Sequence, residues 1–446
     1  MNEETTICAL ATAPGGAIGI IRVSGADAIT ITDKIFSKSL SAAKSQTVHY
    51  GEIKDADGNT IDDVLVSVFR APHSYTGEDS TEISCHGSRY ILSKVLELLI
   101  LNGCRQAMPG EYTQRAFLNG KMDLSQAEAV ADLIAASNQA THKIAMSQLR
   151  GNFSNELAEL RNQLLKITSM LELELDFSDQ DVNFADRNQL LILANQIDNR
   201  ITTLTHSFET GKALKEGIPV AIIGKTSVGK STLLNRLLGE DKAIVSNIHG
   251  TTRDVIEDTT QINGVTFRFI DTAGLRHTDD EIEQLGIERT YRKLDEATII
   301  LWLIDSVPTR EEKEEIKSKT ADKKLIIVEN KIDKEQPSGL YPDSIKISAK
   351  FGTNIDTLES AIYKASDIPE INANDVIVTN ARHYDALKRS HESISRVIEG
   401  LNIGLSGDLL SEDLRDCIHI LAEIVGGEVT TDEVLGNIFS HFCIGK

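Results

Sequence analysis

The chain has 446 residues, 41% of them hydrophobic, which is enough for the cores of about two to four domains. Its formal net charge of −21 argues against a broad nucleic-acid-binding surface, because non-specific affinity for phosphates comes from lysine and arginine, so a local patch or a basic partner must carry any RNA contact. No apolar run reaches the about 18 residues of a membrane span, residues 1–5 lack a secretion signal, and the scattered cysteines form no C-x-x-C pair, so we expect a cytoplasmic protein.

The first 120 residues predict a compact mixed α/β domain. Residues 18–23 and 64–69 are rich in branched apolar side chains, as β-strands are, whereas residues 91–101 have the apolar spacing of a helix. An Asp-Gly-Asn turn signal at residues 57–59 separates two of these elements.

From Asp123 onward the apolar spacing is that of helices. Ser125 and Glu128 match a capping box, which predicts the start of a helix. Apolar stripes recur before and after a central segment, so we expect one α-helical domain with another domain inserted into it. The expected core positions are Phe153, Leu157, Leu160, Leu164, Ile167, Leu171, Leu190, Leu193, Ile197, Ile201, Leu204, Leu410, Leu414, Cys417, Leu421, Ile424, Leu435, Ile438, Phe439 and Phe442.

Residues 218–238 predict a strand, a phosphate loop and a helix. An apolar run ends at Gly224, and the pattern G-x-x-x-x-G-K-S continues through Gly229, Lys230 and Ser231. The glycines let backbone N–H groups turn towards an anion, Lys230 reaches the β and γ phosphates as a catalytic group, and Ser231 offers its hydroxyl to Mg²⁺. The expected phosphate contacts are Ser227, Val228, Gly229, Lys230, Ser231 and Thr232.

Two later segments are placed to sense the γ-phosphate. Residues 245–254 contain Thr252, the expected second hydroxyl ligand of Mg²⁺, and Asp271 follows a strand-like run, where it can hold the metal through water. Leu275 stands where many switch GTPases carry a water-orienting Gln, so another group must orient the water. Further nucleotide contacts are expected at Ser246, Asn247, Ile248, His249, Gly250, Thr251, Thr272, Ala273 and Gly274.

Two short motifs after further strand-like runs predict recognition of guanine. The carboxylate of Asp333 can accept hydrogen bonds from guanine N1–H and N2–H₂, and adenine offers no such pair of donors. A site built around such a pair can reject its absence by roughly 10⁴-fold, so we expect GTP. The expected base contacts are Asn330, Lys331, Asp333, Ser348, Ala349 and Lys350.

Nearly the whole chain resembles the MnmE (TrmE) family of bacterial tRNA-modifying GTPases. Besides the motifs above, the resemblance is carried by residues 12–22, 74–82 and 109–121 and by the C-terminal Cys-Ile-Gly-Lys. It implies an α/β and α fold in which an N-terminal tetrahydrofolate-binding-like α/β domain is followed by a discontinuous α-helical domain containing an inserted Ras-like P-loop G domain. The expected boundaries are 1–120 for the N-terminal domain, 121–213 and 371–446 for the helical domain, and 214–370 for the G domain.

For the G domain, the resemblance implies that Glu283 is catalytic. It also implies that K⁺ replaces an arginine finger, because a fixed cation stabilises the developing phosphoryl charge. It further implies that hydrolysis is stimulated when the two G domains of a homodimer meet. Ser227 stands where the family usually has Asn as a K⁺ ligand, and we still expect faster hydrolysis in KCl than in NaCl. The implied K⁺ ligands are Ser227, Ser246, Ile248 and Thr251.

For the N-terminal domain, the resemblance implies that 5-formyl- or 5,10-methylene-tetrahydrofolate binds as the one-carbon donor. A carboxylate suits the donor edge of a pterin ring, and cations suit the glutamate tail. The implied contacts are Arg22, Glu82, Lys121 and the C-terminal Lys446. The resemblance also implies a chemical role for Cys443 in the modification.

The implied function is modification of tRNA. With an FAD-dependent MnmG-type protein, in a heterotetramer or larger complex, such a GTPase adds an aminomethyl or carboxymethylaminomethyl group at C5 of the wobble uridine (position 34). The chain has no G-x-G-x-x-G dinucleotide fingerprint, so the redox half must come from the partner. Two alternatives stay open: a ribosome-assembly GTPase without one-carbon chemistry, and a nucleotide switch whose N-terminal region only dimerises.

Overall fold

The computed structural model describes residues 5–13, 15–176, 187–239, 258–270, 295–334, 341, 343–372, 374–427, 432–440, 442, 444 and 445. They divide into two compact units. The first comprises Met1–Ala135, Ala145–Ile201 and Asp385–Lys446, and the second comprises Ala136–Ile144 and Thr202–Tyr384. The finer domain boundaries expected above stay predictions. In the part of the chain that the structure describes, no helix combines the length and the apolar character needed to cross a membrane.

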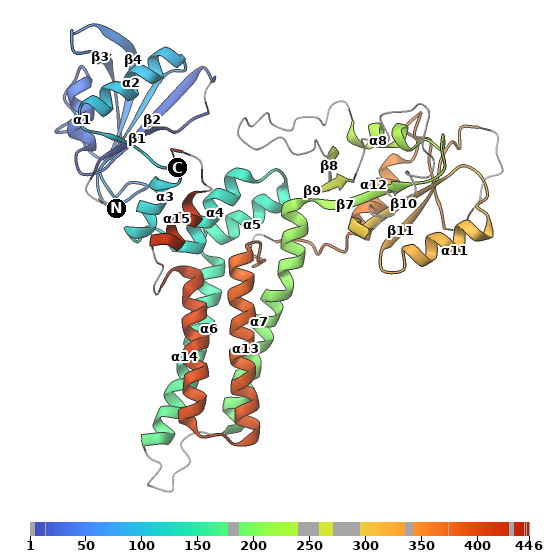
Figure 1. Ribbon diagram of the computed structural model, residues 1–446. Coiled ribbons are helices and arrows are strands. Elements are labelled where there is room, and N and C mark those ends of the chain that lie inside the picture. The colour runs from blue at the N-terminus through green and yellow to red at the C-terminus, as the bar shows by residue number, and fades with distance from the viewer. Residues whose placement is uncertain are drawn as a thin grey trace. The chain divides into compact units, whose positions relative to one another are not determined.

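The first unit contains a six-stranded sheet with the strand order β3-β4-β5-β2-β1-β6 (Figure 1). Helices α1 (Ala28–Ile35) and α2 (Arg89–Leu101) cover one face of it, where alternate residues of β4 are buried against them. The opposite face carries Arg22 and Glu82, which pair across β2 and β5. The strands are β1 (Ile7–Leu10), β2 (Ile18–Ser24), β3 (Thr47–Lys54), β4 (Thr60–Phe69), β5 (Ser80–His86) and β6 (Arg105–Gln106).

Long helices form the rest of this unit. Helices α6 and α14 run side by side (Figure 1), and the predicted apolar stripes are confirmed as buried core, except for Leu193, Ile438 and Phe442, which are half-buried. Helices α5, α7 and α13 continue into the second unit. The helices of this region are α3 (Glu111–Leu118), α4 (Leu124–Ala135), α5 (Gln139–Leu149), α6 (Asn152–Asp176), α7 (Arg187–Glu216), α13 (Ala381–Ile403), α14 (Gly407–Val425) and α15 (Asp432–Ser440).

The predicted capping box at Ser125 and Glu128 is wrong. The cap of α4 is Asp123, whose Oδ1 accepts from the backbone N–H of Gln126 at 2.9 Å, while Gln126 Oε1 accepts from the backbone N–H of Asp123 at 3.0 Å. Ser125 lies inside the first turn and donates its hydroxyl to Asp123 Oδ1 at 2.8 Å. Asp123 and Ser125 are both residue types that cap helices, so the sequence alone does not choose between them. In the structure Asp123 Oδ1 accepts from the N–H of Gln126 and from the hydroxyl of Ser125.

The second unit has a six-stranded sheet with the order β12-β11-β10-β7-β9-β8. Helices α8 and α12 pack on one face and α11 on the other, around a central strand, β10, whose six residues are all buried. All neighbouring strands are parallel except β8 and β9, and helices cover both faces, so the sheet is doubly wound. The elements are β7 (Ile218–Ile223), α8 (Lys230–Leu238), β8 (Asp258–Ile262), β9 (Val265–Phe269), β10 (Ile299–Ile304), α11 (Arg310–Lys319), β11 (Lys324–Glu329), β12 (Ile345–Lys346) and α12 (Ile355–Ala365).

Candidate functional site

The phosphate loop joins β7 to α8 at the carboxyl edge of the second sheet. Gly229 caps α8 with a φ of +105°, and the backbone N–H groups at the start of this helix face the place where an anion binds in such loops. Lys230 Nζ donates to the carbonyl oxygens of Gly224 and Lys225, both at 2.7 Å. Burial lowers the pKa of Lys230. Ser231 and Thr232 follow in the first turn of α8.

Asn330 connects the phosphate loop to the loop expected to read the base. This buried amide donates from Nδ2 to Val228 O at 2.8 Å and accepts at Oδ1 from the backbone N–H of Ala349 at 3.0 Å. A Cβ at Gly229 would collide with Asn330 Nδ2. The second glycine of the motif is therefore required by a tertiary contact as well as by its positive φ.

Lys331 packs against the same loop. Its Nζ donates to Ser227 O at 2.7 Å and pairs with Asp305 Oδ2 at 2.6 Å. Asp305 directly follows β10, and the sequence interpretation missed both this strand and this carboxylate. The signal was available, because Asp305 ends an unbroken apolar run, 299–304.

Asp333 is held by the second base motif. Its Oδ1 accepts from Ser348 Oγ at 2.6 Å, and this hydrogen bond lowers the pKa of Asp333. The carboxylate is therefore ionised at neutral pH and can only accept hydrogen bonds, which suits the two donors of guanine. Lys350 follows in the same loop, with its Nζ 5.2 Å from the ring centroid of Phe351.

Several predicted nucleotide contacts lie outside the described residues. Among them are the catalytic candidate Glu283 and the Mg²⁺ ligand Thr252. Ser227 is the K⁺ candidate that lies inside the described residues, and it has a φ of +60° in the phosphate loop. The other predicted contacts outside the described residues are Ser246, Asn247, Ile248, His249, Gly250, Thr251, Asp271, Thr272, Ala273 and Gly274.

A second candidate site lies on the first unit, around Arg22. Its Nε donates to Glu82 Oε1 at 2.9 Å, and Nη2 lies 2.8 Å from the same oxygen. The rings of Tyr75 and Tyr112 lie 5.5 and 5.6 Å from the guanidinium carbon, within cation–π range. The two tyrosines were not predicted as site residues, although each belongs to a segment that carried the family resemblance.

The C-terminal segment reaches this second site. Arg22 Nη1 donates to Gly445 O at 3.3 Å, and Ile444 forms a β-bridge with Pro109. A Cβ at Gly445 would collide with the carbonyl oxygen of Leu10, so only glycine fits this approach.

The other predicted folate contact inside the described residues, Lys121, bonds to a different segment of the same domain. Lys121 Nζ donates to Pro72 O at 2.8 Å, near the segment that carries Tyr75. Lys446 and Cys443 lie outside the described residues.

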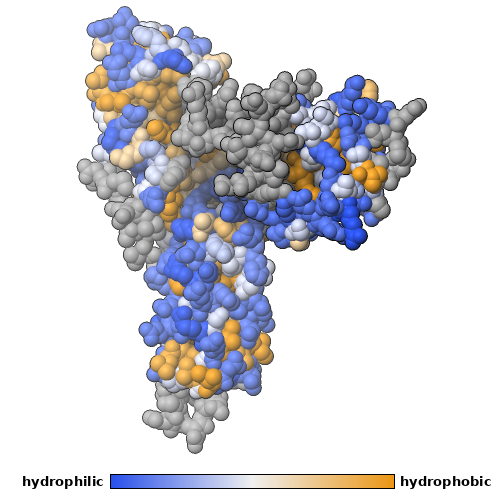
Figure 2. Space-filling model, turned by 45° about the vertical axis from the view of Figure 1, so that its right-hand side comes forward, coloured by the Kyte–Doolittle hydropathy of each residue, from blue (hydrophilic) through white to orange (hydrophobic). Residues whose placement is uncertain are grey.

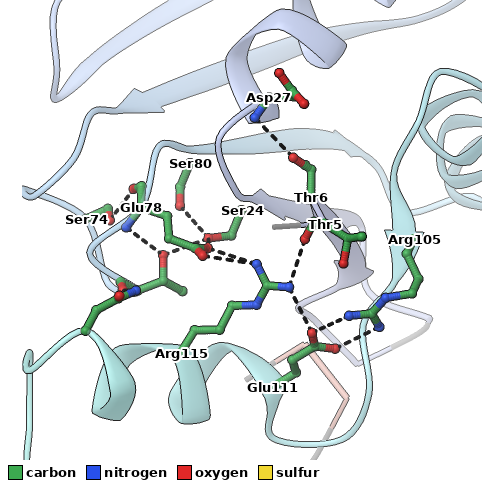
Figure 3. Close-up of polar contacts among 12 residues, drawn as sticks. Thr5, Thr6, Ser24, Asp27, Ser74, Glu78, Ser80, Arg105, Glu111 and Arg115 are labelled. Carbon is green, nitrogen blue, oxygen red and sulfur yellow. Dashed lines mark hydrogen bonds and ion pairs between the residues drawn. The ribbon is translucent and has the colours of Figure 1, made fainter. Parts of the chain in front are cut away.

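A charge network anchors helix α3, which carries Tyr112 (Figure 3). Arg115 binds Glu78 at 3.1 and 3.2 Å, Glu111 at 3.0 Å and the carbonyl oxygen of Thr5 at 2.8 Å. Arg105 adds two further bonds to Glu111. The network holds α3 in place, and α3 carries Tyr112, whose hydroxyl donates to the backbone oxygen of Arg22 at 2.7 Å.

Comparisons with known proteins cover the whole chain. Residues 124–443 match the family described as "MnmE helical domain", and residues 6–121 match "GTP-binding protein TrmE N-terminus". Among solved structures, the G domain of the T. maritima FeoB iron transporter is 24% identical and covers 34% of this chain and 99% of its own, with a TM-score of 0.25.

Curated relatives are similar from end to end. A protein of Bacteroides thetaiotaomicron named "tRNA modification GTPase MnmE" is 59% identical, and one of Phocaeicola vulgatus with the same name is 56% identical. A third, from Flavobacterium johnsoniae, is 48% identical. Each match covers 100% of this chain and 100% of the relative. The chain therefore belongs to the MnmE family of tRNA modification GTPases.

Proposed function

We propose that this tRNA modification GTPase couples GTP hydrolysis to the addition of an aminomethyl or carboxymethylaminomethyl group at C5 of the wobble uridine of certain tRNAs. The redox step belongs to an FAD-dependent MnmG-type partner in a heterotetramer or larger complex. The one-carbon unit comes from 5-formyl- or 5,10-methylene-tetrahydrofolate. The protein acts in the cytoplasm.

The observation that supports the nucleotide half most strongly is the pair of hydrogen bonds that joins Asn330 to the phosphate loop, at Val228, and to the loop expected to contact the base, at Ala349. It places Lys230 and Asp333 at one edge of the sheet, where α/β proteins bind nucleotides. Lys230 stabilises the phosphates, and Asp333 reads guanine. Mg²⁺ would be held by Ser231 and Thr252, and it would neutralise charge on the β and γ phosphates. Glu283 would orient the attacking water, and K⁺ at Ser227 would add positive charge.

The face of the first sheet that is not covered by α1 and α2, and that also carries Arg22 and Glu82, supports a homodimer. Val48, Tyr50 and Leu65 are 60%, 59% and 47% exposed, and Tyr50 lies directly opposite Leu65. Ile18 on the same face is 63% exposed. Figure 2 shows a cluster of apolar residues on the surface of the N-terminal domain. An exposed apolar face of this kind favours association, and a second copy of the chain offers an identical face.

Mass spectrometry of wobble nucleosides tests the function as a whole. In tRNA from cells that lack this protein, we expect the C5-modified uridines to disappear and the unmodified base to accumulate. Restoring the gene should restore the modification, and restoring a Lys230→Ala variant should not. Normal wobble nucleosides in the deleted strain, together with defective ribosomal subunits, would favour the ribosome-assembly alternative.

Calorimetry with 5-formyltetrahydrofolate tests the second site. We expect the wild-type chain to bind it and the Arg22→Ala variant to bind at least about tenfold more weakly, because a charge-assisted hydrogen bond is lost. Arg89→Ala, at an exposed position on α2, is the matched control and should bind normally. No heat with the wild-type chain would remove the folate half of the proposal and leave the nucleotide half intact.

A further inference from the structure

Arg236, in the second turn of α8, contacts the loop that carries the second base motif. Its Nη2 donates to the carbonyl oxygen of Lys350 at 2.9 Å, and its Nε donates to that of Ala349 at 3.4 Å. Gly352 lies against the guanidinium, because a Cβ built there would be 3.7 Å from Arg236 Cζ. One planar group thus holds two consecutive carbonyls of the loop.

The same loop is held from its other side. The backbone N–H of Ala349 donates to Asn330 Oδ1, so the Ala349 residue is bonded at its N–H by Asn330 and at its carbonyl by Arg236. Ala349 is 1% exposed, whereas the Arg236 residue is exposed at the surface of α8. Asn330 fixes the loop to the phosphate loop, and Arg236 fixes it to the helix that begins at Lys230.

These contacts bear on specificity because the loop's position decides what it can read. Guanine carries an acceptor, O6, next to the N1–H that Asp333 is placed to accept. The backbone N–H of Ala349 is used by Asn330, so the next N–H in the loop, that of Lys350, is the one that can donate to O6, and only if the loop keeps its distance from Asp333. Ser348 already couples the loop to Asp333 at 2.6 Å, so a shift of the loop moves both reading groups.

We propose that Arg236 is a positioning residue for guanine recognition: it fixes the 348–350 loop to the phosphate-binding helix, so that the base and the phosphates are held in one frame. The inference rests on the proposed guanine site. Arginine suits the role because its planar fork donates in two directions at once, whereas a lysine reaches one carbonyl and an alanine none.

The test compares Arg236→Ala and Arg236→Lys in the full chain. We expect Arg236→Ala to lower GDP affinity about tenfold, the effect of losing one charge-assisted hydrogen bond, mainly through faster dissociation. The preference for GDP over 6-thio-GDP, which differs only at position 6 of the base, should fall by a similar factor. Arg236→Lys should recover part of both losses.

The matched control is Arg310→Ala, which removes an arginine whose side chain is 92% exposed on α11 and should behave as wild type. An equal loss of affinity for both nucleotides in Arg236→Ala, which leaves the preference unchanged, would overturn the inference, since a general loss of stability does not act on one atom of the base. A wild-type chain without preference for GDP over 6-thio-GDP and over ADP would overturn the guanine site itself, and with it this role.

Discussion

The Asp333→Asn variant is expected to lose about 10³-fold in affinity for guanosine nucleotides and to gain affinity for xanthosine nucleotides. Asp333 is ionised and accepts a hydrogen bond from Ser348, so its free acceptor capacity matches the N1–H and N2–H₂ donors of guanine. An amide presents an N–H₂ group to those donors instead. Xanthine has a carbonyl where guanine has its amino group, so it can accept from the new amide.

Fluorescent GDP and XDP analogues measure this exchange directly. Hydrolysis of XTP by Asp333→Asn should approach the wild-type rate with GTP, because Lys230 and the phosphate loop are unaltered. The control is Asp322→Asn, which makes the same change of charge at a side chain that is 78% exposed and should leave both affinities unchanged. If Asp333→Asn kept wild-type affinity for GDP, the assignment of this carboxylate to the base would be wrong.

The Arg115→Leu variant is expected to lose about 3 kcal/mol of local stability in the N-terminal sheet, because removal of Arg115 leaves the Glu78 carboxylate without its cation and leaves Glu111 paired with Arg105 alone. The side chains of Arg115 and Glu111 are only 8% and 6% exposed. Hydrogen exchange of peptides from β2 and α3 measures the free energy of local opening, which suits a chain of several domains better than one global midpoint.

The matched control for this prediction is Arg415→Leu. Arg415 forms an ion pair with Glu172 in which the two side chains are 70% and 52% exposed, so its loss should cost no more than about 0.5 kcal/mol. Equal protection of β2 in Arg115→Leu and in the wild-type chain would show that the network does not stabilise the sheet.

The same network predicts a loss of stability in acid. Burial alone would raise the pKa of Glu111, but hydrogen bonds from Arg105, from the backbone N–H of Met108 and from Arg115 outweigh it, so the pKa is lowered from its ordinary 4.5. The unfolded chain therefore binds this proton more readily than the folded one. The contribution of Glu111 is present above about pH 4.5 and is lost as the pH falls through the lowered folded value.

Signals that are local in the chain could be predicted from the sequence. The strand, loop and helix around Lys230 follow from contiguous residues whose backbone conformations are limited by glycine and by apolar runs. The stripes from Phe153 to Leu171 predict a buried helix face because the spacing of side chains on a helix is fixed. The order of the motifs predicted the G domain, and the apolar stripes before and after it predicted its insertion into a helical domain. The capping box failed because Asp123 and Ser125 compete within a single turn.

Only the tertiary structure decided which distant groups meet. Arg22 reaches Gly445, 423 residues away, Asn330 reaches Val228, 102 residues away, and Arg236 reaches Lys350, 114 residues away. Asp305 became a partner of Lys331 because β10 lies between β7 and β11 in the sheet. Strand edges offer the same N–H and C=O groups to any neighbour, so the order of strands is set by how the whole core packs, and contacts at the ends of strands depend on that order.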